Sequence, residues 1–259
     1  MKILLIPILV LAVFCIRRSS SQAVKVPSFE SPYEEYAALV FIFANDRVCA
    51  GSVITKKNIL TAAQCVVNPD VPNNVPVTFN NISMYYGSPN ADTTSLLNVD
   101  IAKIVIHEKY NQKVKFSYDI AIIVLSQEIT LTPKVITDAF YATVKPKDGT
   151  DVYAVGIQQK RDFVELTTKV NFNSECQATT KAARQGSPSY TAITCAKSGR
   201  NANVVCNEDY VGGAIFSTTR KTIIALILGT TTTGCTPDPT LYMLLIPDKA
   251  TWIRNNIVL

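Results

Sequence analysis

The chain has 259 residues, of which 47% are hydrophobic and 17% are charged. This composition argues against a disordered chain and favours a globular protein with a large buried core. The formal net charge is +5, but three basic residues and no acidic residue lie before residue 24, so the remainder carries +2. Because no cluster of Lys and Arg is interleaved with aromatic residues, we expect no nucleic-acid partner.

The N-terminus has the organisation of a secretory signal. Lys2 precedes an apolar run, Ile3–Ile16, that is too short to span a bilayer comfortably. Ser21-Gln22-Ala23 then has the small-x-small pattern of a cleavage site, so residues 1–23 are predicted to be a signal peptide and the mature chain to begin near Val24. A buried N-terminal strand is the alternative. With no later membrane-helix candidate, the sequence predicts a secreted, extracellular protein without a membrane partner.

Short strands dominate the chain after this signal. Segments rich in Val, Ile, Phe and Thr are separated by breaks rich in Pro and Asn, which favours an all-β barrel or sandwich. The end differs, because Pro247 opens a segment whose apolar residues fit a closing amphipathic helix. The expected strands are Ala37–Ala44, Val48–Ile54, Val99–Ile106, Asp119–Leu125, Val152–Ile157, Phe163–Phe172, Gly213–Ser217 and Thr222–Gly229.

Cysteine usage indicates disulfides. Without Cys15 of the signal, six cysteines remain, an even number that implies a disulfide framework with 15 conceivable pairings. A metal site would need closely spaced Cys and His, and His107 is the only histidine, so we expect no metal and no cofactor. Asn81-Ile82-Ser83 is a possible glycosylation site. The six cysteines are Cys49, Cys65, Cys176, Cys195, Cys206 and Cys235.

Several motifs, in one order, resemble those of trypsin-like serine proteases. Cys49–Ile54 and Leu60–Cys65 resemble the family's Cys-Gly-Gly-Ser-Ile-Ile and Leu-Thr-Ala-Ala-His-Cys around the catalytic histidine. Ile104–Asn111 resembles Ile-Ile-x-His-x-x-Tyr-Asn, and Tyr118–Ile122 resembles Asn-Asp-Ile-Ala-Leu around the catalytic aspartate. Cys206–Ala214 stands where the family has Cys-x-Gly-Asp-Ser-Gly-Gly-Pro.

The resemblance, which runs from about residue 35 to the end, implies the fold and the disulfides. The fold would be all-β, with two packed six-stranded antiparallel β-barrels and a C-terminal helix. A single protease-homologue domain would cover residues 24–259, with the barrel boundary near residues 130–145. The implied disulfides are Cys49–Cys65, Cys176–Cys195 and Cys206–Cys235, each closing a short loop and each stabilising the fold by roughly 3 kcal/mol.

Residues that cleave peptides in this family are missing here. Cleavage needs a hydroxyl nucleophile, an imidazole base and a carboxylate that orients the base. Asp119 fills the carboxylate position, but Gln64 stands at the base position, and a carboxamide does not ionise near neutral pH. His107 falls before the aspartate strand, where we expect a structural or surface role.

The nucleophile segment carries one residue more than the family motif. Counted from the preceding cysteine, the serine position holds Tyr210, and counted back from Gly212-Gly213 it holds Val211. Neither residue supplies an activatable serine. Glu208 or Asp209 takes the place of the glycine that donates to the oxyanion in the family, so that donor should also be impaired.

The specificity pocket is expected to be occluded. Val204 and Val205 stand where the family has its pocket-base residue, and the family's Ser-Trp-Gly becomes Ile227-Leu228-Gly229. Thr240 replaces a glycine that keeps the pocket open, so its branched side chain should fill the space. No basic residue followed by Ile-Val-Gly-Gly is present near the start, which indicates that the family's activation cleavage is lost.

These losses predict a catalytically inactive, secreted serine protease homologue that acts by binding. The Gln at the base position and the lost serine resemble the scabies mite inactivated protease paralogues. That resemblance implies secretion into the mite gut and inhibition of host complement by binding its plasma components. The alternatives are another binding role in a protease cascade, as a decoy or cofactor, and a residual serine-type endopeptidase with Tyr210 as nucleophile. The oligomeric state is left open.

Overall fold

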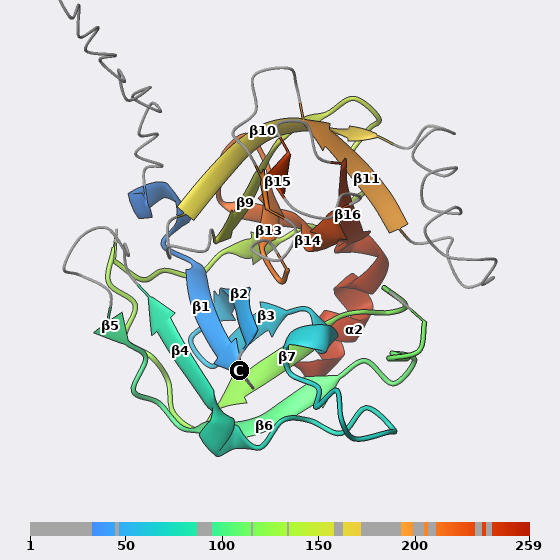
Figure 1. The fold of residues 1–259 in the computed structure, drawn as a ribbon. Coiled ribbons are helices and arrows are strands. Elements are labelled where there is room, and N and C mark those ends of the chain that lie inside the picture. Colours follow the sequence, from blue (N-terminus) through green and yellow to red (C-terminus); the bar gives the residue numbers. More distant parts are fainter. Residues whose placement is uncertain are drawn as a thin grey trace, which may run out of the picture.

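The computed structural model describes residues 33–44, 47–86, 95–114, 116–133, 135–157, 163–171, 193–198, 205–206, 211–230, 235–236 and 240–259. Two β-sheets lie against each other, and helix α2 (Ala250–Asn256) ends the chain (Figure 1). The predicted signal, residues 1–23, lies outside the described residues. In the part of the chain that is described, no helix is long and apolar enough to cross a membrane.

The first sheet is antiparallel and has the strand order β5-β4-β1-β2-β3-β7-β6. Its edge strands β5 and β6 are separated in the chain by residues 97–100 alone. The segment that contains β5 and β6 therefore closes the sheet. When β5 and β6 are counted as one strand, six strands surround the core of the first barrel. The strands are β1 (Leu39–Ala44), β2 (Arg47–Thr55), β3 (Asn58–Thr61), β4 (Ile82–Tyr86), β5 (Ser95–Leu96), β6 (Ile101–Ile106) and β7 (Ala121–Leu125).

The second sheet has the order β13-β9-β10-β11-β16-β14-β8. A further β13–β14 pairing closes six of these strands into a barrel, while β8 pairs in parallel with β14. The strands are β8 (Phe140–Tyr141), β9 (Asp151–Ile157), β10 (Phe163–Asn171), β11 (Ile193–Ser198), β13 (Ala214–Phe216), β14 (Thr222–Thr230) and β16 (Thr240–Leu245). A separate two-stranded sheet pairs β12 (Val205–Cys206) with β15 (Cys235–Thr236).

The predicted fold class, with two antiparallel six-stranded barrels and a C-terminal helix, is confirmed. Each of the eight predicted segments contains an observed strand, with ends that shift by a few residues. The helix begins as a 3-10 turn, Pro247–Lys249, that continues into α2. Strands β3, β4, β11 and β16 were not predicted, and neither were the two-residue strands β5, β8, β12 and β15.

The larger of two buried hydrophobic clusters spans both barrels, and the smaller lies within the second barrel. Every residue of β7 is buried, which explains why this strand has no alternation of polar and apolar residues. The largest buried cluster joins residues of the first barrel, such as Leu39 and Ile122, with Phe216 and Leu226 of the second. At about 25 cal/mol per Å² of buried apolar area, such a joint core favours docking of the barrels.

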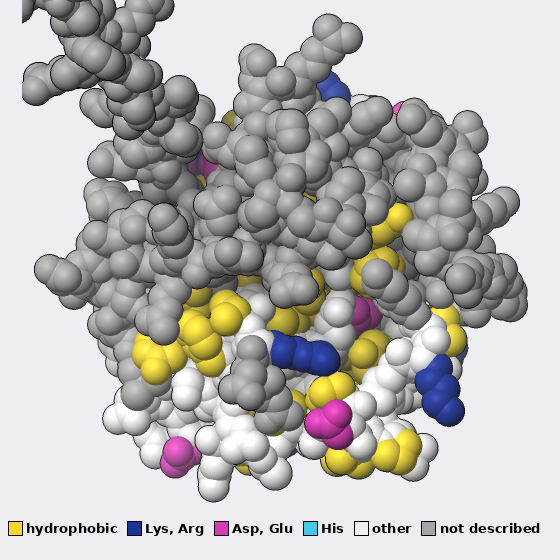
Figure 2. Space-filling view, viewed as in Figure 1, with side chains coloured by type: hydrophobic (Ala, Val, Ile, Leu, Met, Phe, Trp, Pro, Cys, Tyr) yellow, Lys and Arg dark blue, Asp and Glu magenta, His cyan; other side chains and the backbone are white. Residues whose placement is uncertain are grey.

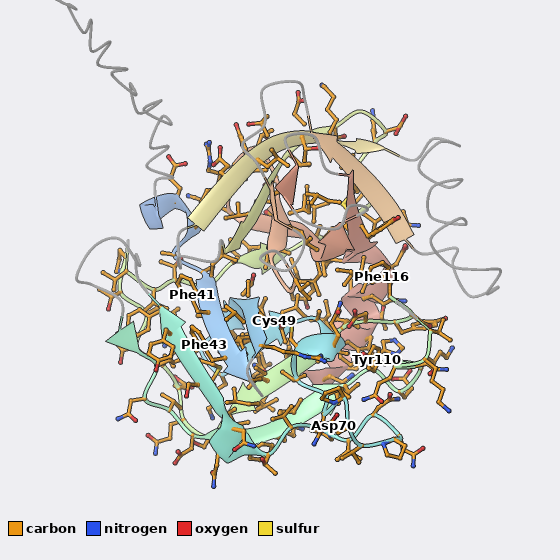
Figure 3. All side chains as sticks on the ribbon, in the orientation of Figure 1. Phe41, Phe43, Cys49, Asp70, Tyr110 and Phe116 are labelled. Atoms are coloured by element: carbon orange, nitrogen blue, oxygen red, sulfur yellow. A yellow bond between two sulfur atoms is a disulfide. The ribbon has the colours of Figure 1, made fainter. Side chains whose placement is uncertain are left out.

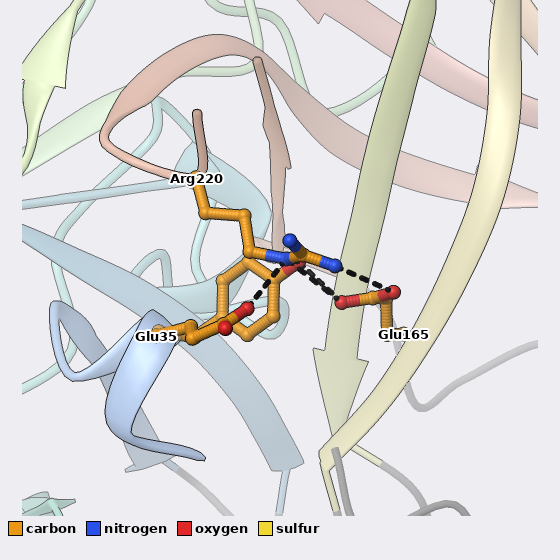
Figure 4. Close-up of polar contacts among 4 residues, drawn as sticks. Glu35, Glu165 and Arg220 are labelled. Carbon is orange, nitrogen blue, oxygen red and sulfur yellow. Dashed lines mark hydrogen bonds and ion pairs between the residues drawn. The ribbon is translucent and has the colours of Figure 1, made fainter. Parts of the chain in front are cut away.

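A polar cluster of Glu35, Tyr36, Glu165 and Arg220 fastens the start of the first barrel to the second (Figure 4). Arg220 Nε lies 2.8 Å from Glu35 Oε2 and 3.3 Å from Glu165 Oε2. The Tyr36 hydroxyl donates to Glu165 Oε2 at 2.5 Å, and its ring lies 5.2 Å from that of Phe216. We call these four residues the Arg220 cluster.

The chain end is tied back to the first barrel. The buried Asn58 of β3 donates to the Val258 carbonyl at 2.7 Å, and the Val258 N–H donates back to Asn58 Oδ1 at 3.1 Å. Trp252 of α2 donates to Glu108 Oε2 at 3.0 Å. Helix α2 therefore connects the second barrel, where it begins, with the first.

The Cys49–Cys65 disulfide is present. Cys206 and Cys235 lie directly opposite each other in the β12–β15 backbone pairing, which is the register that a disulfide between them requires. Cys195 is in β11, but Cys176 lies outside the described residues. The Cys176–Cys195 and Cys206–Cys235 bridges stay predictions.

Candidate functional site

Gln64 and Asp119, predicted as the base and carboxylate positions, lie together. Gln64 is in the 3-10 turn Ala63–Cys65, which follows β3 and is held to β2 by the Cys49–Cys65 disulfide. Asp119 lies just before β7, the strand that pairs with β3. The Gln64 N–H donates to Asp119 Oδ1 at 2.8 Å, and Gln64 Nε2 donates to Asp119 Oδ2 at 2.6 Å.

The Gln64 carboxamide is also bound to the second barrel. Its Nε2 donates to the Leu228 carbonyl of β14 at 3.0 Å, in addition to its bond with Asp119. A primary amide nitrogen has two hydrogens, so both donors of this side chain are used. The carboxamide thus fixes the distance between the barrels at this point, but it has no lone pair that could take a proton near neutral pH.

The Asp119 carboxyl is 1% exposed. Burial raises its pKa to about 7, although hydrogen bonds from the Gln64 N–H, the Gln64 side chain and the Ala63 N–H act in the opposite direction. Burial penalises the charged form, and neutral amide donors compensate less than a cation would. Asp119 therefore titrates near neutral pH.

Val211 is the first residue described after the gap in the nucleophile segment, and it contacts the first barrel. Its carbonyl accepts the Ala50 N–H at 2.9 Å, next to the Cys49–Cys65 disulfide. Gly212 follows with a φ of 79°, and a Cβ there would come within 2.2 Å of the Ala50 carbonyl oxygen, so only glycine fits. Which of Tyr210 and Val211 stands at the serine position stays open. Tyr210, Glu208 and Asp209 lie outside the described residues.

Phe116, which the sequence reasoning missed, precedes β7 of the first barrel and packs against the second barrel (it is labelled in Figure 3). Its side chain is 5% exposed, and its ring centroid lies 5.1 Å from that of Tyr242 in β16. A Cβ on Gly229 of β14 would lie 3.2 Å from Phe116 Cζ, so the ring rests on this glycine. Phe116 has a φ of 66°, an uncommon conformation for a bulky residue.

Only some of the residues that were predicted to occlude the specificity pocket lie in the described part of the chain. Leu228 is 1% exposed and belongs to the shared core. Val204 and the side chains of Val205 and Thr240 lie outside the described residues, so the filling of the pocket by Thr240 stays a prediction. Asn81 is exposed at the end of the 3-10 turn Phe79–Asn81, a position that a glycan could occupy.

His107 is a buried residue, which fits the structural role and not the surface role that were both expected for it. It is 6% exposed and stacks on Trp252 at 5.0 Å, with Tyr118 at 4.8 Å on its ring. Its Nδ1 accepts the Lys109 N–H at 3.1 Å. Burial lowers the pKa of this imidazole, and the charges of Lys249 and Lys109 lower it further while Glu108 raises it. Among the described residues, no three His, Cys, Asp or Glu side chains are grouped so that they could hold a metal.

The fold and the paired Gln64 and Asp119 define a two-barrel protein built on a serine protease framework. The model of the trypsin family matches residues 27–253. The chain therefore belongs to the trypsin family of serine proteases.

Solved structures with the same fold have low sequence identity to this chain. Mouse neuropsin, a serine protease expressed in the limbic system of mouse brain, is 19% identical with a TM-score of 0.64, covering 86% of this chain and 95% of its own. Kallikrein-related peptidase 10 in complex with Zn²⁺ is 16% identical with a TM-score of 0.64 and the same coverage. The scabies mite inactivated protease paralogue S-D1 is 18% identical with a TM-score of 0.68, covering 86% of this chain and 93% of its own.

Proposed function

We propose that this member of the trypsin family is catalytically inactive and acts by binding. The observation that carries the proposal is the Gln64 carboxamide, whose two amide hydrogens are bound by Asp119 and Leu228 at the position of the family's catalytic base. Peptide cleavage on this framework requires a group there that accepts a proton from the nucleophile and returns it to the leaving group.

No other imidazole can take over this task. His107 is the only histidine of the chain, and it is buried in a stack with Trp252 and Tyr118. Val211, whose carbonyl accepts the Ala50 N–H, has an aliphatic side chain without a nucleophilic atom, and the other count places Tyr210, not a serine, at the nucleophile position. Base and nucleophile are thus both absent, so a single substitution cannot restore hydrolysis.

The finer part of the proposal concerns the partner. The chain shares its fold with an inactivated protease paralogue of the scabies mite, which supports a role without catalysis. We extend the proposal to a secreted inhibitor that binds host plasma proteins, with complement components as the expected targets. Loops on a rigid framework are free to vary, so we place the partner contacts on exposed loops. The packing of Phe116 against Gly229 and Tyr242, which narrows the space between the barrels, supports this placement.

The first experiment tests catalysis on the purified mature protein. We expect no labelling by a fluorophosphonate probe and no hydrolysis of generic peptide substrates between about pH 5 and 9, because that window covers the ionisation of an ordinary imidazole base. The Gln64→His variant should stay inactive, since it restores the base without a nucleophile. Stoichiometric labelling of either protein would contradict the proposal.

The second experiment tests binding with host plasma as the source of partners. We expect complement components to be captured and complement lysis to be inhibited, with inhibition lost when Asn68–Asn81 or Lys181–Tyr190 is replaced by a Gly/Ser loop. The first stretch is described and lies at the surface next to β4, whereas the second lies outside the described residues. If substitutions that line the old cleft abolish inhibition while both loop replacements keep it, the surface-binding proposal fails.

A further inference from the structure

A pocket of about 410 Å³ opens in the first barrel beside Phe116, and its lining includes Gln64 and Asp119. This volume lies within the range of roughly 300–1,000 Å³ that is typical of small-molecule sites. Phe116, Val67 and Val114 contribute apolar walls, and Arg47 and Lys113 contribute charge. Figure 3 labels Phe116 and Tyr110 on this face, and Figure 2 shows dark blue and yellow side chains close together on it. We call it the Arg47 pocket.

The donors in the Arg47 pocket suit an anion. Arg47 is exposed, and its Nη1 donates to the Gln64 carbonyl at 3.2 Å, which orients the guanidinium while the fork retains further N–H groups. Tyr110 lines the same pocket, and its pKa is affected by the charges of Asp119 and Arg47. Burial raises the pKa of Tyr110, the Asp119 charge raises it further, and the Arg47 charge lowers it.

The one carboxyl of the pocket is already occupied. Both oxygens of Asp119 accept hydrogen bonds from Gln64, and its burial raises the pKa of that carboxyl to about 7. Asp119 is therefore a poor partner for a cationic ligand. Arg47 and Lys113, in contrast, are exposed, and together they give the described rim of the pocket a positive charge.

The walls of the pocket are braced by hydrogen bonds between two loops. Asn74 Nδ2 donates to the Tyr110 carbonyl at 2.6 Å, and Gln112 Nε2 donates to the Asn68 carbonyl at 3.0 Å. The Gln112 N–H donates to Asn74 Oδ1 at 3.4 Å. Two loops fixed in this way lose little conformational freedom when a ligand binds, which lowers the entropic cost of binding.

We propose that the Arg47 pocket binds a carboxylate carried on an aromatic or aliphatic group, with the carboxylate on Arg47 and Tyr110 and the apolar group against Phe116 and Val67. A guanidinium pairs with a carboxylate through two parallel N–H donors, which gives geometric selectivity as well as affinity. The phenol hydroxyl of Tyr110 supplies a further donor, and the apolar walls remove the attached group from water. Asn68–Asn81, one stretch of the partner surface proposed above, borders this pocket through Asn68 and Asn74. The ligand test therefore uses single-residue variants that leave this stretch intact.

The test uses the mature chain and phenylacetate, with neutral phenylacetamide as the matched control ligand. Binding is followed by calorimetry and by backbone amide shifts of Gln64 and Gln112 in NMR spectra. We expect phenylacetate to bind at least about tenfold more tightly than the amide, because only the acid forms a charge-assisted bond with the guanidinium. A peptide ending in a free Phe carboxylate, compared with its amidated form, shows whether a chain end binds better than the small acid.

Three variants locate the site on the pocket. Arg47→Gln should weaken phenylacetate binding at least about tenfold, and Tyr110→Phe about threefold, since a charged donor contributes more than a neutral one. Arg254→Gln removes the same charge from the exposed face of α2, outside the pocket, and should leave the affinity unchanged. Any of three results would overturn the proposal. Phenylacetate and phenylacetamide bind equally well, Arg47→Gln binds phenylacetate as the wild type does, or no saturable binding is seen at about 10 mM ligand, a concentration at which even weak sites fill.

Discussion

Two acidic sites of this molecule differ in what holds their carboxyl groups. Asp119 is 1% exposed and is bound by neutral amide donors of Gln64 and Ala63. Glu165 of the Arg220 cluster is 19% exposed in its side chain and is bound by the Arg220 guanidinium and the Tyr36 hydroxyl. One carboxyl therefore has hydrogen bonds without a countercharge, and the other has both.

The difference shows how a countercharge changes the behaviour of a buried carboxyl. A carboxylate buried beside a cation keeps its charge because attraction offsets desolvation, whereas amide donors alone offset only part of it. The pKa of Asp119 rises to about 7 for this reason. The Asp119 carboxyl, held by Gln64, is therefore partly protonated at neutral pH.

The largest effect is expected when the Arg220 cluster loses its cation. Arg220→Met leaves Glu35 and Glu165 close together without a countercharge. The substitution should lower the free energy of unfolding by roughly 3 kcal/mol. This is the low end for breaking a buried ion pair, because the Arg220 side chain is 27% exposed. Denaturant unfolding measures this change. Arg220→Lys keeps the positive charge but loses the paired N–H donors of the guanidinium, so it should lower the free energy of unfolding by less. If Arg220→Met unfolds at the same denaturant concentration as the wild type, the stabilising role of the Arg220 cluster is contradicted.

The second effect is a pH dependence that Asp119 imposes on stability. Its folded pKa of about 7 exceeds the ordinary value of about 3.9 in an unfolded chain, so the folded state binds the proton more strongly. The resulting stabilisation is full below about pH 4 and is lost as the pH rises through about 7. Between pH 5 and 8, the wild type should lose roughly 2 kcal/mol of its free energy of unfolding through this titration. The Asp119→Asn variant should not show this loss, which is measured by unfolding both proteins at each pH. Parallel pH profiles of the two proteins would refute this assignment.

A third effect follows when Asp119 receives a cation. Gln64→His places an ionisable imidazole beside the carboxyl and should lower the pKa of Asp119 to below about 5, since an opposite charge within a few ångströms favours the ionised form. Gln64→Met removes the two side-chain hydrogen bonds without adding charge and should raise that pKa instead. NMR titration of the Asp119 Cγ resonance distinguishes the two directions, and a shift of the same sign in both variants would be incompatible with this account.

The smallest effect is expected at an exposed ion pair. Lys169 Nζ lies 2.6 Å from Asp151 Oδ1 across β9 and β10, with the two side chains 63% and 59% exposed. Water and salt screen such a pair, so Lys169→Met should change the free energy of unfolding by no more than about 0.5 kcal/mol. Chemical unfolding at low and high salt checks this limit. A loss as large as that of Arg220→Met would show that burial does not separate the two classes of ion pair.

The sequence predicted the strands that carry continuous β-branched runs, such as β7 and β14, because those runs are buried on both sides. It missed β3, which has four residues and begins with a buried Asn58. The partner that satisfies Asn58 is Val258, at the other end of the chain. A polar residue whose partner is so distant carries no local signal of burial.

At the site, Gln64 and Asp119 were predicted from motifs, and the structure brings them together. Arg47 and Phe116 were not predicted. Arg47 donates to the carbonyl of Gln64, which lies in a turn linked to β2 by a disulfide. The Phe116 ring packs on Gly229 of the other barrel, where a side chain would leave it little room. Both placements arise from packing between segments far apart in the chain, which no spacing of residue types encodes.

The Arg220 cluster also bears on how the molecule unfolds. Its residues come from the segment before β1, from β10 and from the turn before β14, and Tyr36 belongs to the core that both barrels share. Separating the barrels would expose that core and break the cluster in one step. The two barrels are therefore expected to melt as one cooperative unit, so damage in either barrel lowers the stability of both.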